Sequence, residues 1–65
     1  MKLFQLHYLN SSDAVVLDCR HAARHDLDAI REAERRSFTH TIEVWDGERM
    51  IARVKKSSVA IRSRI

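Results

Sequence analysis

The sequence contains one cysteine, one glycine and no proline in 65 residues. The single cysteine, Cys19, excludes a disulfide framework and the zinc sites that are built from pairs of cysteines. The single glycine, Gly47, excludes the glycine-rich loops that hold nucleotide phosphates. No apolar run approaches the roughly 18 residues that a membrane span needs, and Lys2, Gln5 and His7 interrupt the first apolar segment. We therefore expect a small cytoplasmic domain that has no membrane partner.

Positive charge is concentrated toward the C-terminus. Residues 1–52 contain seven basic and nine acidic side chains, whereas residues 53–65 contain five basic side chains and no acid. A basic tail of this kind attracts phosphate backbones, but it also keeps a small protein soluble. No aromatic side chain lies among the five charges, which favours the second role. We predict one domain over residues 1–55, followed at 56–65 by a basic tail or a short fifth strand.

Two segments near the N-terminus alternate between apolar and polar side chains, which is the pattern of half-buried strands. They cover residues 2–9 and 14–20, and a cluster of turn-forming residues from Asn10 to Asp13 separates them. Because the connection is so short, we expect the two segments to pair as an antiparallel hairpin.

Residues 26–36 carry the features of an α-helix. Asp26 is a favourable N-cap, and Asp28 adds negative charge near the positive end of the helix dipole. The apolar stripe of this segment is narrow and includes the small side chains of Ala29 and Ala33. We therefore expect the helix to approach a sheet closely while contributing little buried area of its own.

Residues 39–45 and 49–55 predict a second hairpin around Asp46 and Gly47. The order of elements is then strand, strand, helix, strand, strand. An α+β fold satisfies this order, with a four-stranded antiparallel sheet and one helix packed on one face. The predicted core consists of Phe4, Leu6, Tyr8, Val15, Leu17, Cys19, Leu27, Ile30, Ala33, Phe38, Ile42, Val44, Met50, Ala52 and Val54.

The register of the second hairpin can be argued from its apolar residues. A two-residue Asp-Gly loop would mix charged and apolar side chains on both faces of the hairpin. A loop one residue longer pairs Val44 with Met50 and Ile42 with Ala52, which gives one clean apolar face. We therefore predict the longer loop, with Gly47 at a position of positive φ.

One helix covers only one side of a four-stranded sheet. The other side is expected to display Leu3, Leu9, Val16, Trp45 and Ile51, which is more apolar surface than a small monomer normally exposes. Short chains also gain little stability from their own core, and self-association is a common remedy. We therefore predict a homodimer through this face or through an edge strand. The residues expected at the contact are Trp45, Ile51, Arg49, Arg53, Leu3 and Val16.

Cys19, His21 and His25 are the nearest approach to a reactive or metal-binding cluster. Two histidines four residues apart could share a zinc ion on a helix, but residues 20–25 are expected to form a loop between strand and helix. A Cys–His nucleophile would lack both an orienting third group and an oxyanion hole. We therefore expect no metal, no cofactor and no catalytic residue, and so not an enzyme.

The favoured function is a non-enzymatic protein-interaction or structural module that associates with itself or with another protein, whose peptide could add as a strand to an exposed edge. Nucleic-acid binding is the alternative, because the tail is basic and Trp45 could stack on a base. Acidic residues share the helix surface with its arginines, which favours a salt-bridged solvent face instead. The residues that would contact nucleic acid are Arg31, Arg35, Lys55, Lys56, Arg62 and Arg64.

The segments LFQLHYLN, DLDAIREAERR and IEVWDGERMIARV follow one another in this order. In layout they resemble small bacterial domains of unknown function that are built as hairpin, helix and hairpin. The resemblance extends over roughly residues 2–54, and the loop RHAARH and the basic tail have no counterpart in it. It implies the fold described above and no activity, so it assigns no functional residue.

Overall fold

The computed structural model describes residues 1–56, so the predicted tail or fifth strand lies almost wholly outside the described residues. The elements follow the predicted order. They are β1 (Lys2–Leu9), β2 (Val15–Ala23), α1 (Asp26–Arg36), β3 (Thr41–Asp46) and β4 (Arg49–Val54).

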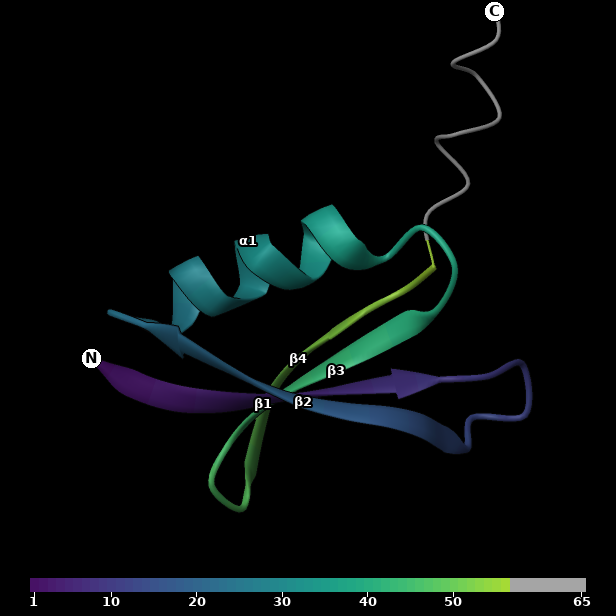
Figure 1. Cartoon of the computed structure of the whole chain (residues 1–65), viewed down its shortest axis with the longest axis horizontal. Coiled ribbons are helices and arrows are strands. Elements are labelled where there is room, and N and C mark those ends of the chain that lie inside the picture. The colour runs from purple at the N-terminus through teal and green to yellow at the C-terminus, as the bar shows by residue number, and fades with distance from the viewer. Residues whose placement is uncertain (57–65) are drawn as a thin grey trace, which may run out of the picture.

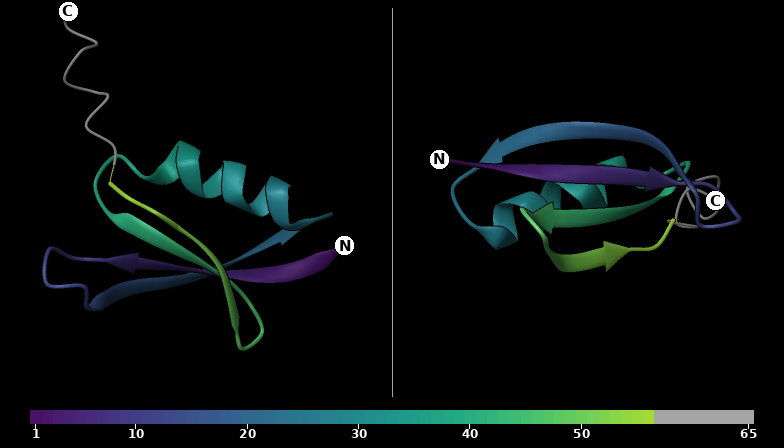
Figure 2. Two further views of the ribbon diagram at one scale, coloured as in Figure 1. Left: turned by 180° about the vertical axis from the view of Figure 1, so that it is seen from behind. Right: turned by 90° about the horizontal axis from the view of Figure 1, so that it is seen from below.

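The four strands form one antiparallel sheet in the order β2-β1-β3-β4, and α1 lies across one face of it (Figure 1). The predicted α+β fold is therefore confirmed. The two central strands, β1 and β3, provide the fully buried side chains of Phe4, Leu6, Ile42 and Val44. Strands β2 and β4 are the outer strands, as the two views in Figure 2 show.

Two alanines bring α1 onto the sheet. Ala29 and Ala33 are four residues apart on one side of the helix, and both are fully buried against the apolar cluster of β1 and β3. A methyl group is the smallest side chain that still excludes water at such a contact. The expectation of a close helix with a small apolar stripe therefore agrees with the packing.

Five predicted core residues are instead at least 45% exposed: Val15, Leu17, Leu27, Phe38 and Met50. Val15, Leu17 and Met50 lie on the outer strands, where no further strand or helix of residues 1–56 covers them. Leu27 is two residues from Ala29, which places it on nearly the opposite side of the helix. Conversely, Leu9 was expected on the uncovered face but is buried, although it lies apart from the core cluster.

The predicted register of the β3–β4 hairpin is wrong. Val44 pairs with Ala52 rather than with Met50, because an irregularity after Val44 leaves Ile51 as an extra residue in β4. The hairpin loop is the two-residue segment Gly47-Glu48, closed by Asp46 and Arg49. The predicted positive φ of Gly47 is confirmed at +64°, a conformation that glycine adopts without steric cost.

The connection between β2 and α1 also differs from the expectation. β2 continues to Ala23, three residues beyond the predicted end at Arg20, so His21 and the two alanines after it belong to the strand rather than to a loop. The helix N-cap is His25, whose side chain makes no capping hydrogen bond, and Asp26 is the first helical residue. Asp26 therefore acts through the helix dipole rather than as a cap.

Candidate interaction surface

The face of the sheet away from α1 is crossed by a row of polar contacts. His7 Nε2 lies 3.7 Å from Asp18 Oδ1 on one side, and the His7 ring lies 5.8 Å from that of Trp45 on the other. Trp45 Nε1 donates a hydrogen bond to Glu43 Oε1 at 3.1 Å, and Arg53 Nη1 lies 3.6 Å from Glu43 Oε2. The indole is thus partly covered by its own sheet, and this face is less apolar than the sequence indicates.

The six residues predicted for the contact do not form one patch. Ile51 packs against the core on the helix side, because the extra residue in β4 turns its side chain inward. Arg49 forms ion pairs with Asp46 at 3.3 Å and with Asp26 at 3.7 Å. Ile51 and Arg49 therefore do not belong to the open face on which they were predicted. Leu3, Trp45 and Arg53 lie on β1, β3 and β4, whereas Val16 lies on the outer strand β2.

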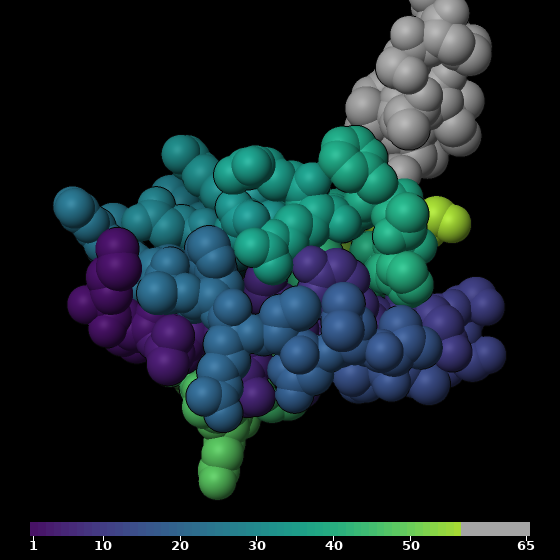
Figure 3. All heavy atoms as spheres, in the orientation of Figure 1, coloured from purple at the N-terminus to yellow at the C-terminus, as the bar shows by residue number. Residues whose placement is uncertain are grey.

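The outer strand β2 is the most exposed element of the sheet. It has nine residues, and only Ala23 at its end is buried. Val15, Val16 and Leu17 follow one another, and each is 52% exposed. Figure 3 shows β2 in blue along the front of the molecule, with no other element over it. We define the β2 edge as the outward side of Val15–Ala23, and it is the candidate interaction surface.

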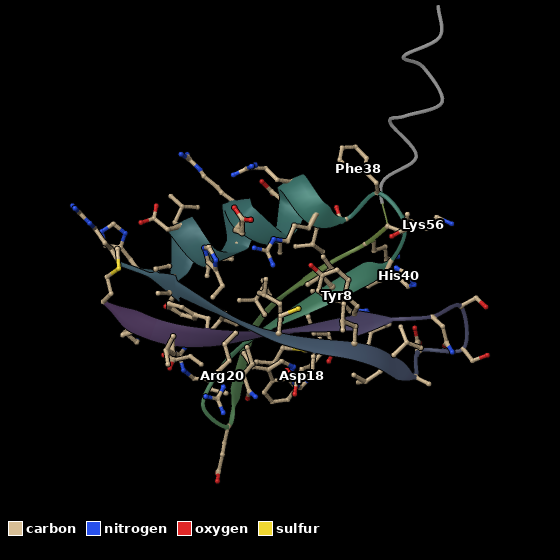
Figure 4. The ribbon with its side chains drawn as sticks, viewed as in Figure 1. Tyr8, Asp18, Arg20, Phe38, His40 and Lys56 are labelled. Atoms are coloured by element: carbon tan, nitrogen blue, oxygen red, sulfur yellow. The ribbon has the colours of Figure 1, made fainter. Side chains whose placement is uncertain are left out.

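Two opposite charges lie close together on the β2 edge. Asp18 and Arg20 are both exposed, and both side chains point away from the helix side of the sheet (Figure 4). They share a face because strand residues two apart point the same way. Cys19 lies between them, is partly buried, and is opposite the buried Leu6 of β1. The β2 edge therefore carries apolar side chains at its start and a charge pair at its centre.

The other outer strand, β4, is protected against pairing. It has six residues, and the exposed ones include Arg49 and Arg53. Its extra residue Ile51 interrupts the regular ladder. Short length, exposed charge and bulges are the features that discourage addition of a further strand. β2 has one bulge, near Val16, but the pairing from Leu17 to Ala23 is regular.

The sequence contained part of the signal for the β2 edge. Three consecutive apolar residues at positions 15–17 do not fit a strand with one buried face, because they put apolar side chains on both sides. Strand order was the missing fact. An outer position for β2 follows only from the pairing of β1 with β3.

The candidate chemical cluster is spread over two elements. Cys19 and His21 lie on β2, and His25 precedes α1. Among residues 1–56, no three His, Cys, Asp or Glu side chains gather as a metal-binding group. A shallow hollow of about 190 Å³ lies near His40 and Lys56, and its lining contains no carboxylate and no cysteine.

The helix arginines take part in ion pairs along α1. Arg36 Nε lies 2.6 Å from Glu32 Oε2, and Arg35 Nη1 lies 2.9 Å from Glu32 Oε1. Arg31 and the strand-following Lys55 and Lys56 are exposed, whereas Arg62 and Arg64 lie outside the described residues. Of the predicted nucleic-acid contacts, Arg35 is therefore already engaged by a carboxylate, and the others stay predictions.

The hydrogen bond from Arg36 lowers the pKa of Glu32 below its ordinary value. A carboxylate whose pKa is lowered by folding adds stability above its unfolded pKa, and loses that contribution as the pH falls through its folded pKa. We expect Glu32→Gln to lower the free energy of unfolding by about 0.5 kcal/mol at pH 7, and by progressively less as the pH falls through the folded pKa of Glu32. Urea unfolding at a series of pH values measures this. Glu34→Gln, at an exposed position, is the control, and a Glu32→Gln deficit that persists at low pH would contradict the ion-pair explanation.

No helix in residues 1–56 is long and apolar enough to cross a membrane. No protein-family model, no curated protein and no solved structure matches this chain. The resemblance to bacterial hairpin–helix–hairpin domains therefore concerns the layout of elements, and function has to be argued from the surfaces of the molecule.

Proposed function

We propose that this protein is a non-enzymatic interaction module that associates with a second copy of itself through the β2 edge. The observation that carries the proposal is the nine-residue outer strand, whose first three side chains are apolar and half-exposed. An unpaired edge of this kind exposes a row of backbone donors and acceptors that a further strand can satisfy. Pairing would also cover apolar surface that a 65-residue domain otherwise leaves in water.

The sequence-based prediction placed the dimer contact on the open sheet face or on an edge strand, and the proposal commits to the edge strand. On the open face, Trp45 donates to Glu43 and lies beside His7, so its polar and apolar parts already have partners. The β2 edge offers both backbone hydrogen bonds and apolar side chains. For this reason we place the self-association there.

Two leucines of similar exposure test this assignment. Leu17 is 52% exposed on β2, and Leu3 is 61% exposed on β1. We expect Leu17→Lys to raise the dimer dissociation constant about tenfold, because lysine on an edge strand opposes pairing. Sedimentation velocity over a micromolar concentration series measures the constant.

Leu3→Lys is the matched control and is expected to leave the dimer unchanged. If Leu3→Lys dissociates the dimer and Leu17→Lys does not, the open face is the interface and the proposal is wrong. If the unmodified chain is a monomer at all these concentrations, self-association fails altogether. Circular dichroism of each variant verifies that the fold is retained.

Nucleic-acid binding is distinguished by a mobility-shift experiment at low salt. The self-association module is expected to give no shift at micromolar protein, because two of the helix arginines, Arg35 and Arg36, are already paired with Glu32. A shift that disappears when residues 56–65 are removed would support the alternative function of the basic tail.

A further inference from the structure

The charges on the β2 edge select one way of pairing two copies. A two-fold axis perpendicular to the sheet places β2 of one copy antiparallel to β2 of a second copy. The two sheets then form one continuous sheet. Residues that then face each other lie on the same side of the sheet, so their numbers have an even sum. Only a few of these registers have their axis near the centre of the regularly paired segment Leu17–Ala23.

Three adjacent registers differ in what Asp18 and Arg20 meet. A register centred on Asp18 places this carboxylate opposite its own copy, and one centred on Arg20 places two guanidinium groups opposite each other. A register centred on Cys19 places Asp18 of each copy opposite Arg20 of the other. Opposite charges stabilise a cross-strand pair, and like charges directly opposite each other destabilise it.

We propose that two copies of this chain join through β2 about a two-fold axis at Cys19, forming a continuous eight-stranded sheet with two reciprocal Asp18–Arg20 ion pairs. The inference rests on the proposed function and specifies its geometry. Both side chains are exposed and lie on the sheet face away from the helix (Figure 4). His7 of the neighbouring strand β1 lies 3.7 Å from the Asp18 carboxylate, and the Asp18 side chain is still 51% exposed.

The remaining neighbours in this register are compatible with pairing. Leu17 lies opposite His21 of the second copy, and the two Cys19 residues face each other at the axis. All of these side chains are on the helix side of the sheet, because Leu17, Cys19 and His21 pair with Tyr8, Leu6 and Phe4 of β1. The bulge near Val16 falls outside the five residues from Leu17 to His21, so it does not interrupt this segment.

Charge reversal tests the register. Asp18→Arg and Arg20→Asp each replace two attractive pairs by two repulsive ones, and each is expected to raise the dimer dissociation constant about tenfold. The double variant Asp18→Arg/Arg20→Asp restores opposite charges across the axis, so it is expected to dimerise as the unmodified chain does. Asp28→Arg on the exposed helix surface makes the same change of net charge as Asp18→Arg and is the control for that variant.

Thiol oxidation provides a second measurement of the same axis. Directly opposed residues of antiparallel strands have Cα atoms about 4.5–5.5 Å apart, which lies within the range that a disulfide spans. Diamide, which accepts two electrons and two protons as two thiols join, is expected to convert the dimer to a covalent one through Cys19. Cys19→Ser is expected to remain non-covalent under the same conditions.

The outcomes separate the register from the self-association. A monomeric unmodified chain overturns both proposals. A dimer that is weakened by Leu17→Lys, but that shows neither rescue in the double variant nor a disulfide at Cys19, retains the β2 edge and overturns the register. Rescue together with cross-linking supports the register. A dimer whose association is weakened equally by Asp28→Arg would reflect net charge alone and would overturn it.

Discussion

Phe4→Ala is expected to remove a large part of the free energy of unfolding at 25 °C. Phe4 is fully buried at the centre of the core cluster and is the largest side chain there. Truncating a buried phenylalanine to alanine costs about 3–5 kcal/mol, from lost apolar burial and from the cavity that remains. A chain of this length has a total stability of about 3–10 kcal/mol, so the loss is comparable with the whole.

The second phenylalanine of the chain provides a matched control. Phe38 follows the helix and is 56% exposed, so the same substitution removes little buried area. We expect Phe38→Ala to change the free energy of unfolding by less than about 1 kcal/mol. Urea unfolding at one fixed protein concentration, followed by circular dichroism, compares the three proteins. Equal losses for the two variants would contradict the described core.

The residue pattern predicted where each element lies along the chain better than it predicted which elements pair with one another. The predicted bounds of β1 and α1 agree with the structure, because alternation and helical spacing are local properties of the chain. The extent of β2 was underestimated, since the residues after Arg20 begin with the polar His21, which an exposed outer strand tolerates. Local pattern therefore identifies a strand more readily than it identifies where the strand ends.

The register errors have a specific physical cause. An extra residue at Ile51 shifts the pairing of β4 by one position, and this exchanges which side chains face the core. A bulge leaves the residue types almost unchanged, so alternation alone does not locate it. A similar irregularity lies near Val16 of β2, where alternation also gave no indication of it.

The candidate surface depends on strand order, which no local pattern contains. Once β1 pairs with both β2 and β3, β2 becomes an outer strand, and the apolar residues that suggested a core position become an exposed edge. In the sequence alone, Asp18 and Arg20 look like the polar positions of an ordinary alternating strand. Their importance as exposed charges becomes clear only once the structure shows that β2 is the outer strand of the described sheet.

Ala33→Leu is expected to lower the free energy of unfolding by about 3 kcal/mol. Ala33 is fully buried where α1 lies against the sheet, and Ala29 occupies the same side one turn earlier. The added carbons have no space at this contact, so the helix must move away from the buried side chains of Ile42 and Val44. Inserting atoms into a filled core typically costs about 1–3 kcal/mol, and the upper end applies because a whole element is displaced.

Glu34→Leu is the control for Ala33→Leu. It introduces the same side chain at the next position of the helix, where the native residue is exposed. Since leucine is a good helix former, this control is expected to remain within about 0.5 kcal/mol of the unmodified chain. If Ala33→Leu proved as stable as Glu34→Leu, the helix would stand further from the sheet than two buried alanines allow. The uncovered area of the sheet would then extend under α1 and compete with the β2 edge as a contact.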